Sequence, residues 1–152
     1  MTHSQSDRDF SHLLTRLERR VAERLRAVLV PEGCGIEEWR VLDLLACSGG
    51  CTMSEVAEHA FLPAPTLTKL VDRLVANNIV YRRVDLEDRR RVRIFLTARG
   101  KSLHRRLSGI VERSQGEVLA ATGDAELLQQ LLLRLGNALD SRSAEMASGP
   151  QQ

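Results

Sequence analysis

The sequence contains few aromatic residues and no long apolar segment. One Trp, one Tyr and three Phe make up 3% of its 152 residues. A chain rich in Leu, Ala, Arg and Glu with so few aromatics is typical of a mostly helical protein. No stretch approaches the roughly 18 apolar residues of a transmembrane helix, and residues 1–9 lack the apolar core of a secretory signal. We therefore expect a cytoplasmic protein with no membrane partner.

Cysteine is equally scarce, with only Cys34, Cys47 and Cys51. An odd number without a secretory signal favours reduced thiols over a disulfide framework. Cys34, in a glycine-rich turn, is expected to be the most exposed of the three. Two interpretations remain open: buried structural residues, as free cysteines commonly are, or a redox switch. A metal site at Cys47, Cys51 and His59 would need further ligands at short spacing, so no metal or other cofactor is expected.

The common catalytic signatures are missing too. The sequence has no G-x-x-x-x-G-K-[ST] loop, no G-x-G-x-x-G, no H-E-x-x-H and no Ser-His-Asp arrangement. We therefore do not expect an enzyme. The charge distribution is more informative, because residues 82–106 contain ten basic against three acidic residues, while residues 107–152 contain three against six. A local basic block of this kind is typical of a surface that binds a polyanion.

Apolar residues at helical spacing predict a first helix over about 10–30, preceded by a flexible N-terminus at 1–9. Its apolar face consists of Phe10, Leu13, Leu14, Leu17, Val21, Leu25 and Val28. A second apolar run covers 36–45 and ends at Ser48-Gly49-Gly50. Thr52 and Glu55 have the spacing of a capping box, which predicts a short helix over about 53–60.

The next segment predicts a helix over about 64–76, after a break that contains two prolines. Its buried face consists of Leu67, Leu70, Val71 and Leu74. Residues 79–84 and 92–96 then change to a strand pattern, which predicts a β-hairpin with a charged tip. Thr97 is expected to cap a long helix through about 121, and Asp124 a last helix to about 140. Residues 141–152 are expected to be disordered.

Two short helices followed at once by a basic hairpin predict a mostly α fold with a small β-hairpin wing, a winged helix-turn-helix. A helix fits the major groove of DNA, and an arginine-tipped hairpin can reach the adjacent minor groove. We expect the DNA-binding lobe at about 36–97. The candidate contacts to double-stranded DNA are Thr66, Thr68, Lys69, Arg73, Arg89, Arg90 and Arg91.

Three stretches of the chain resemble the MarR family of transcriptional regulators. They are Leu-Val-Asp-Arg-Leu at 70–74, the segment 79–90, and Leu-Thr-Ala-Arg-Gly at 96–100. The family's D-x-x-D-x-R wing pattern falls on Asp85, Asp88 and Arg90. The resemblance implies that Arg90 enters the minor groove beside Arg89, and that Asp85 and Asp88 structure the wing. It also implies a homodimer that binds a pseudo-palindromic operator, commonly as a repressor relieved by a small aromatic or phenolic ligand.

The chain departs from the family pattern at the turn between the two short helices. Phe61 and Pro63 occupy positions where the family usually has glycine and a polar cap. Pro65 stands where a serine is frequent, which removes one hydroxyl contact. Asn78 replaces a glycine before the wing, a tolerable change because Asn also accepts positive φ. These departures affect the base contacts and not the fold.

The first helix and the last two, at about 10–30 and 97–140, have longer apolar faces than one small lobe can bury. We expect them to be dimerisation helices, with a monomeric bundle as the alternative. An effector pocket between these helices and the DNA-binding lobe would use His12, Arg16, Trp39 and Arg40, although Trp39 is also a candidate core residue. Two other functions stay open: a redox-sensing regulator using Cys34, Cys47 or Cys51, and a dimer that binds an acidic protein instead of DNA.

Overall fold

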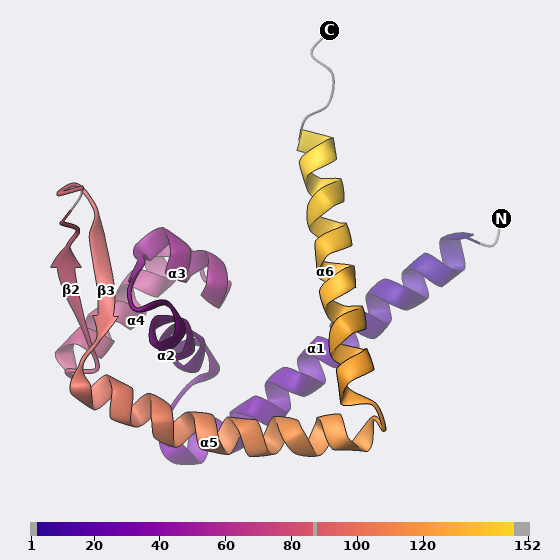
Figure 1. The fold of residues 1–152 in the computed structure, drawn as a ribbon, viewed down its shortest axis with the longest axis horizontal. Coiled ribbons are helices and arrows are strands. Elements are labelled where there is room, and N and C mark those ends of the chain that lie inside the picture. The colour runs from indigo at the N-terminus through magenta and orange to yellow at the C-terminus, as the bar shows by residue number, and fades with distance from the viewer. Residues whose placement is uncertain (1–2, 87, 148–152) are drawn as a thin grey trace, which may run out of the picture. The chain divides into compact units, whose positions relative to one another are not determined.

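The computed structural model describes residues 3–86 and 88–147, with side-chain surroundings given for residues 9–86 and 88–141. The elements in chain order are α1 (His3–Leu29), the 3-10 turn η1 (Val30–Glu32), α2 (Ile36–Ser48), β1 (Cys51–Thr52), α3 (Met53–Ala60), α4 (Ala64–Ala76), β2 (Val80–Val84), β3 (Val92–Leu96), α5 (Ala98–Ala121) and α6 (Ala125–Ala147). Figure 1 labels the six α-helices and the strands β2 and β3. The chain divides into two compact units, residues 1–114 and 115–152. Each unit is described by itself.

The two terminal helices are longer than the sequence pattern predicts. Helix α1 begins at His3 instead of near residue 10, and α6 continues to Ala147 instead of ending near residue 140. Both extensions lack Pro and Gly, so the helix propagates although the extra turns have no apolar face. The remainder of the expected C-terminal tail, 148–152, lies outside the described residues. No helix in the described part of the chain is both long and apolar enough to span a membrane.

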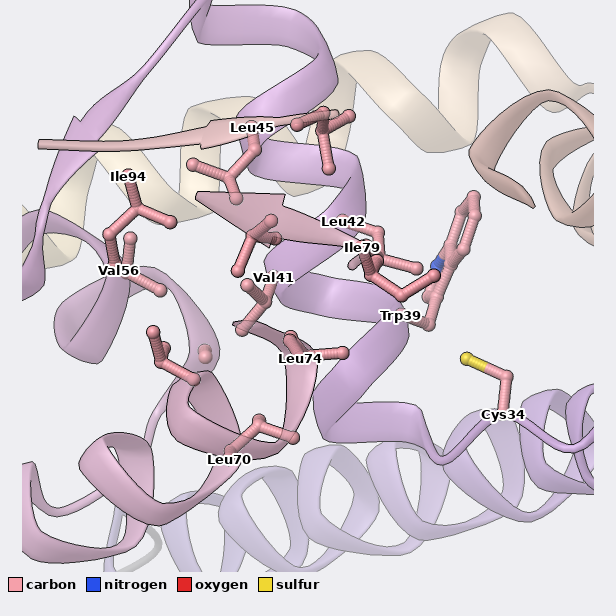
Figure 2. Close-up of a cluster of buried hydrophobic side chains, with 14 of the residues drawn as sticks. Cys34, Trp39, Val41, Leu42, Leu45, Val56, Leu70, Leu74, Ile79 and Ile94 are labelled. Carbon is pink, nitrogen blue, oxygen red and sulfur yellow. The ribbon is translucent and has the colours of Figure 1, made fainter. Parts of the chain in front are cut away.

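The core of the first unit lies between α2, α3, α4 and the sheet, and α5 closes it. Figure 2 shows side chains from these elements converging, among them Val41 and Leu42 from α2 and Leu74 from α4. All four residues of the predicted apolar face of α4 are buried. Leu107 and Val111 add the contribution of α5. This packing determines which side of α4 faces outward.

The sheet has three antiparallel strands in the order β1-β3-β2. The predicted hairpin is present, with Val80 paired to Leu96 and Val84 paired to Val92. The third strand, β1, was not predicted, because two residues are too few to show a strand period. It joins the start of α3 to the wing by pairing Cys51 with Ile94.

Helix α3 begins with the predicted capping box. The Thr52 hydroxyl accepts a hydrogen bond from the Glu55 amide at 3.3 Å, and the Glu55 carboxylate accepts one from the Thr52 amide at 2.7 Å. The bonds from the Thr52 amide and hydroxyl hold the pKa of Glu55 below its usual value. The cap therefore fixes the start of α3 through a charged acceptor.

The base of the wing is joined to α5 at Thr97. Its hydroxyl lies 2.7 Å from the Asn78 carbonyl oxygen and 3.1 Å from that of Ile79, and it accepts from the Gly100 amide at 3.0 Å. Gly100 is packed so closely that an added Cβ would lie 2.1 Å from the Ile79 carbonyl oxygen. Asn78 adopts the expected left-handed conformation, with φ of 57°. The turn after α4, the wing and α5 thus share one junction.

Gly100→Ala tests the tightness of this junction. The new methyl group would force the Ile79 backbone away from α5, so we expect a loss of about 1–3 kcal/mol in the free energy of unfolding. Gly109→Ala is the matched control, because nothing lies within 4 Å of an added Cβ at that position of the same helix. The control should be neutral or gain about 0.5–1 kcal/mol from helix propensity. Equal urea denaturation midpoints for the two variants would contradict the close contact.

Candidate nucleic-acid interface

Helix α4 presents a polar outer face because its apolar face lies in the core. Thr66, Thr68 and Lys69 are exposed on it. The Thr68 hydroxyl donates to the Ala64 carbonyl oxygen at 2.9 Å, which orients the side chain along the helix. The two predicted threonines and the lysine are therefore accessible to a DNA groove that would lie against α4.

Arg73 has a different environment from the other predicted residues of α4. Its guanidinium lies 3.5 Å from the Glu38 carboxylate of α2, while its side chain remains 61% exposed. Burial raises the pKa of Glu38, and the positive charge of Arg73 opposes that rise. Arg73 therefore compensates a half-buried carboxylate, and a contact with DNA would have to compete with this pairing.

A second ion pair joins α4 to the wing. The Arg82 guanidinium of β2 donates to the Asp72 carboxylate of α4 at 2.6 Å. Neither residue was among the predicted site residues, because pairing across ten positions depends on how the strand packs beside the helix. The pair fixes β2 against α4, and it neutralises Asp72, the one carboxylate on the outer face of α4.

The tip of the wing is organised by its two predicted carboxylates. The Asp85 side chain accepts from the Asp88 amide at 3.3 Å, and the Asp88 side chain accepts from the Arg90 amide at 3.0 Å. Asp85 also lies 3.6 Å from the guanidinium of Arg93 on β3. A backbone bond from Asp85 to the Arg91 carbonyl, 2.8 Å long, closes the loop. These contacts hold the loop in one shape without help from DNA.

The three wing arginines are not equivalent. Arg91 lies 3.5 Å from the Asp88 carboxylate and so helps to hold the loop. Arg89 and Arg90 are exposed, and neither forms an ion pair with any residue that the structure describes. Glu87, the remaining acid of the tip, lies outside the described residues. Adjacent guanidinium groups repel each other, so two such side chains on a fixed loop favour an anionic partner.

Phe61, one of the departures from the family pattern, ends α3 in a left-handed conformation. Its φ is 55°, an unfavourable value for a bulky residue, and its side chain is 80% exposed. The guanidinium of Arg40 lies 5.6 Å from the centre of its ring. A cation–π contact therefore holds the ring at the turn between the two helices.

The cysteines correct one expectation. Cys34 is buried and not the most exposed, because the turn after η1 folds it back and its amide bonds the Leu29 carbonyl at 3.2 Å. Burial, with a smaller effect from Glu38, raises the pKa of the Cys34 thiol to about 12. Cys51 is also buried, 2.9 Å from the Ser48 hydroxyl, while Cys47 is exposed. Cys34 therefore lacks the thiolate that oxidation requires.

The residues expected to form an effector pocket lie in different surroundings. Trp39 is buried in the core, and Arg40 reaches Glu18 of α1 at 4.0 Å. His12 and Arg16 are exposed on α1. In the described part of the chain, no hydrogen bond, ion pair or ring contact joins these four side chains. The ring that Trp39 meets is His104 of α5, stacked at 5.3 Å between centroids, a contact the sequence pattern did not predict.

These features define a winged helix-turn-helix DNA-binding protein. Helix α4, the recognition helix, has one face buried in the core and a polar face toward solvent. The short capped helix α3 packs beside it, and the wing presents two exposed arginines. Residues 34–91 match the family model described as "MarR family". This segment, which runs from α2 into the wing, is therefore of the MarR type, a family of transcriptional regulators.

Individual relatives agree with this assignment. The chain is similar to the homoprotocatechuate degradative operon repressor of Escherichia coli, with 29% identity over 108 residues, 67% of this chain and 72% of that protein. Its fold is similar to that of the transcriptional regulator PA4135, with a TM-score of 0.76, 27% identity, and coverage of 86% and 95% of the two chains. It is also similar to NadR in complex with 4-hydroxyphenylacetate, with a TM-score of 0.71, 26% identity, and coverage of 90% and 91%.

Asp88→Ala distinguishes the effect of the wing loop's shape on DNA binding from the effect of its net charge. The change removes a negative charge, so electrostatic attraction alone would tighten DNA binding. We expect the loss of loop shape to outweigh this effect, so that affinity falls by about 1 kcal/mol, roughly fivefold, because the bonds to the Arg90 amide and Arg91 are lost. Fluorescence anisotropy with a duplex selected by the wild-type protein from a random pool measures this change. Ser54→Ala, at the start of α3, is the control for an ordinary surface substitution.

Proposed function

We propose that the chain is a repressor that binds a pseudo-palindromic operator as a symmetric homodimer and releases it when a small aromatic or phenolic ligand binds. The DNA-binding lobe is assigned to about 36–97, and the dimerisation helices to about 10–30 and 97–140. The observation that carries the DNA contact is the wing tip, where Arg89 and Arg90 are exposed beside a loop that Asp85 and Asp88 have already ordered.

The proposed contact uses two grooves. The outer face of α4 enters the major groove, where Thr66, Thr68 and Lys69 are placed to meet base edges or phosphates. The wing reaches the adjacent minor groove, whose negative potential attracts Arg89 and Arg90. The Asp72–Arg82 pair supports this arrangement, since it fixes the distance between helix and wing. Arg73 and Arg91, which are both paired within the chain, serve mainly to hold the two surfaces in place.

The proposed dimer rests on apolar surface that α1 leaves exposed. Phe10, Leu13, Leu17 and Val21 recur at steps of three and four along one face, and each is 41–51% exposed. In the C-terminal unit, α6 independently exposes apolar residues, namely Leu127, Leu131, Leu132, Leu133 and Leu139. Apolar faces of this length on terminal helices favour burial against a partner of the same kind. Two-fold symmetry would set the two α4 helices about one DNA turn apart.

The ligand response is proposed from the ligands and names of similar proteins. NadR is similar in fold and carries 4-hydroxyphenylacetate in its solved complex, and the E. coli relative is named for the operon of an aromatic compound's degradation. His12, Arg16, Trp39 and Arg40 are the residues we assign to such a pocket, with the partner subunit's helices completing it. A ligand can act there only if it binds the DNA-competent and DNA-incompetent states with different affinity.

Arg90→Ala tests the wing contact. We expect operator affinity to fall by about 1–3 kcal/mol, while the slope of log affinity against log salt becomes shallower by about 1, the value for one lost phosphate-like contact. Arg113→Ala removes the same charge from an exposed position of α5 and should leave both quantities unchanged. Anisotropy titrations from 50 to 300 mM salt, roughly the range over which such slopes are resolved, decide the question. Identical slopes for Arg90→Ala and wild type would exclude the wing as a DNA contact.

Leu17→Glu tests the dimer. Leu17 is 47% exposed in the single chain, so a charge there costs the isolated fold little but would be buried in the proposed interface. We expect sedimentation equilibrium to show a monomer, with operator affinity lost in parallel. Thr15→Glu places the same charge on the opposite side of α1 and should remain dimeric. A dimeric Leu17→Glu protein would rule out this face of α1 as the interface.

A further inference from the structure

The outward face of α4 has a proline at its centre. The apolar face of the helix is buried, so the positions opposite it point away from the core. At steps of four and three residues, these positions are Pro65, Lys69 and Asp72, and all three are exposed. The N-terminal residues of a recognition helix are the ones that meet base edges. Pro65, in the first turn, is therefore the residue of this face expected to lie nearest the bases.

The first turn of α4 has few hydrogen-bond donors. Pro63 and Pro65 have no backbone N–H, and Pro63, at the N-cap, supplies no side-chain cap. Ala64 between them is exposed and has an apolar side chain. The Thr68 hydroxyl donates to the Ala64 carbonyl oxygen at 2.9 Å, so its one hydrogen is used within the helix. This start of α4 is poorly suited to hold a phosphate through free amides, as helix N-termini commonly do.

Pro65 also lines a hollow of about 450 Å³ beside α4, with Leu62 and Leu70 as its other apolar walls. The polar walls are Glu37, Thr66, Lys69 and Arg73. The charges of Lys69 and Arg73 are balanced by Glu37 and by Glu38, which lies 3.5 Å from Arg73. The hollow therefore has little net charge to attract a phosphate, and its surface at Pro65 fits an apolar group.

The major groove of DNA offers one apolar group among its hydrogen-bonding edges, the C5-methyl of thymine. We propose that Pro65 is a specificity-determining residue that contacts a thymine methyl group, so that each half of the operator has thymine at the base pair facing the first turn of α4. The inference rests on the proposed entry of α4 into the major groove. A serine at this position would hydrogen-bond to several bases, whereas the proline accepts only an apolar neighbour.

Deoxyuridine tests the contact, because it pairs as thymidine does and lacks only the methyl group. The wild-type full chain first selects a duplex from a random pool, and each thymine of that duplex is then replaced in turn. Fluorescence anisotropy should show affinity falling about fourfold at one position of each half-site, the effect of losing one buried methyl group. Unchanged affinity at every position would overturn the proposal.

Pro65→Ser distinguishes base reading from a structural role. The variant should bind the thymine and deoxyuridine duplexes equally at that position, and a random pool selected with it should lose the preference for thymine there. If Pro65 only shaped the helix, both affinities would fall by the same factor and their ratio would remain about fourfold. That result would overturn the assignment. The deoxyuridine scan itself uses the wild-type chain and does not depend on the stability of a variant.

Pro63→Ser is the matched control, since it makes the same exchange at the N-cap of the same helix. It should keep the wild-type ratio between the two duplexes. Lys69→Gln should lower affinity and make the salt dependence shallower, because a positive charge is lost, and should also keep the ratio. A ratio that disappears in either of these variants and persists in Pro65→Ser would place the methyl group against another residue and contradict the proposal.

Failure of this inference and failure of the proposed function give different results. If the chain selects no duplex, or if affinity does not fall with salt, operator binding fails and the role of Pro65 fails with it. If the selected duplex depends on salt and on Arg90 as expected, but no deoxyuridine substitution weakens it, only the role of Pro65 is wrong.

Discussion

The Thr97 hydroxyl joins three parts of the molecule, namely the turn after α4, the base of the wing and the start of α5. It meets the carbonyl groups that follow α4, caps α5, and stands at the base of β3. Because Gly100 allows α5 to approach the Ile79 backbone directly, no side chain can act as a spacer there. The end of α4, the base of the wing and the start of α5 are therefore packed directly against one another.

Arginine has two uses in this lobe, and neighbouring carboxylates decide between them. Arg82, Arg91 and Arg93 are paired with Asp72, Asp88 and Asp85, and these pairs give the wing its shape. Arg89 and Arg90 project from that shape toward solvent. A loop with arginines alone would be mobile and self-repelling, while a loop with matched acids throughout would have no charge left for DNA. Within six residues, the D-x-x-D-x-R order combines carboxylates that order the loop with arginines that remain exposed for the proposed DNA contact.

Local signals predicted most of this architecture. The Thr52 capping box, the apolar face of α4 and the cap at Thr97 fixed helix boundaries that the structure reproduces within a residue or two. Contacts between distant segments could not be predicted in this way. Three features depend on how the helices and strands pack against one another, and no periodic sequence pattern indicates them. They are the pairing of Arg73 with Glu38, the stacking of His104 on Trp39, and the two-residue strand β1. The burial of Cys34 belongs to the same group.

The bond between Asp72 and Arg82 has a consequence for how DNA could be released. With the bond made, the recognition face is electrically neutral at this point. If β2 swings away from α4, the wing withdraws a cation and at the same moment leaves a bare carboxylate facing the phosphates. One small displacement would thus weaken DNA binding in two ways. The attraction between Arg82 and the phosphates would be lost, and the Asp72 carboxylate would repel the phosphates. The proposed DNA contact would therefore be sensitive to a movement much smaller than the width of a groove.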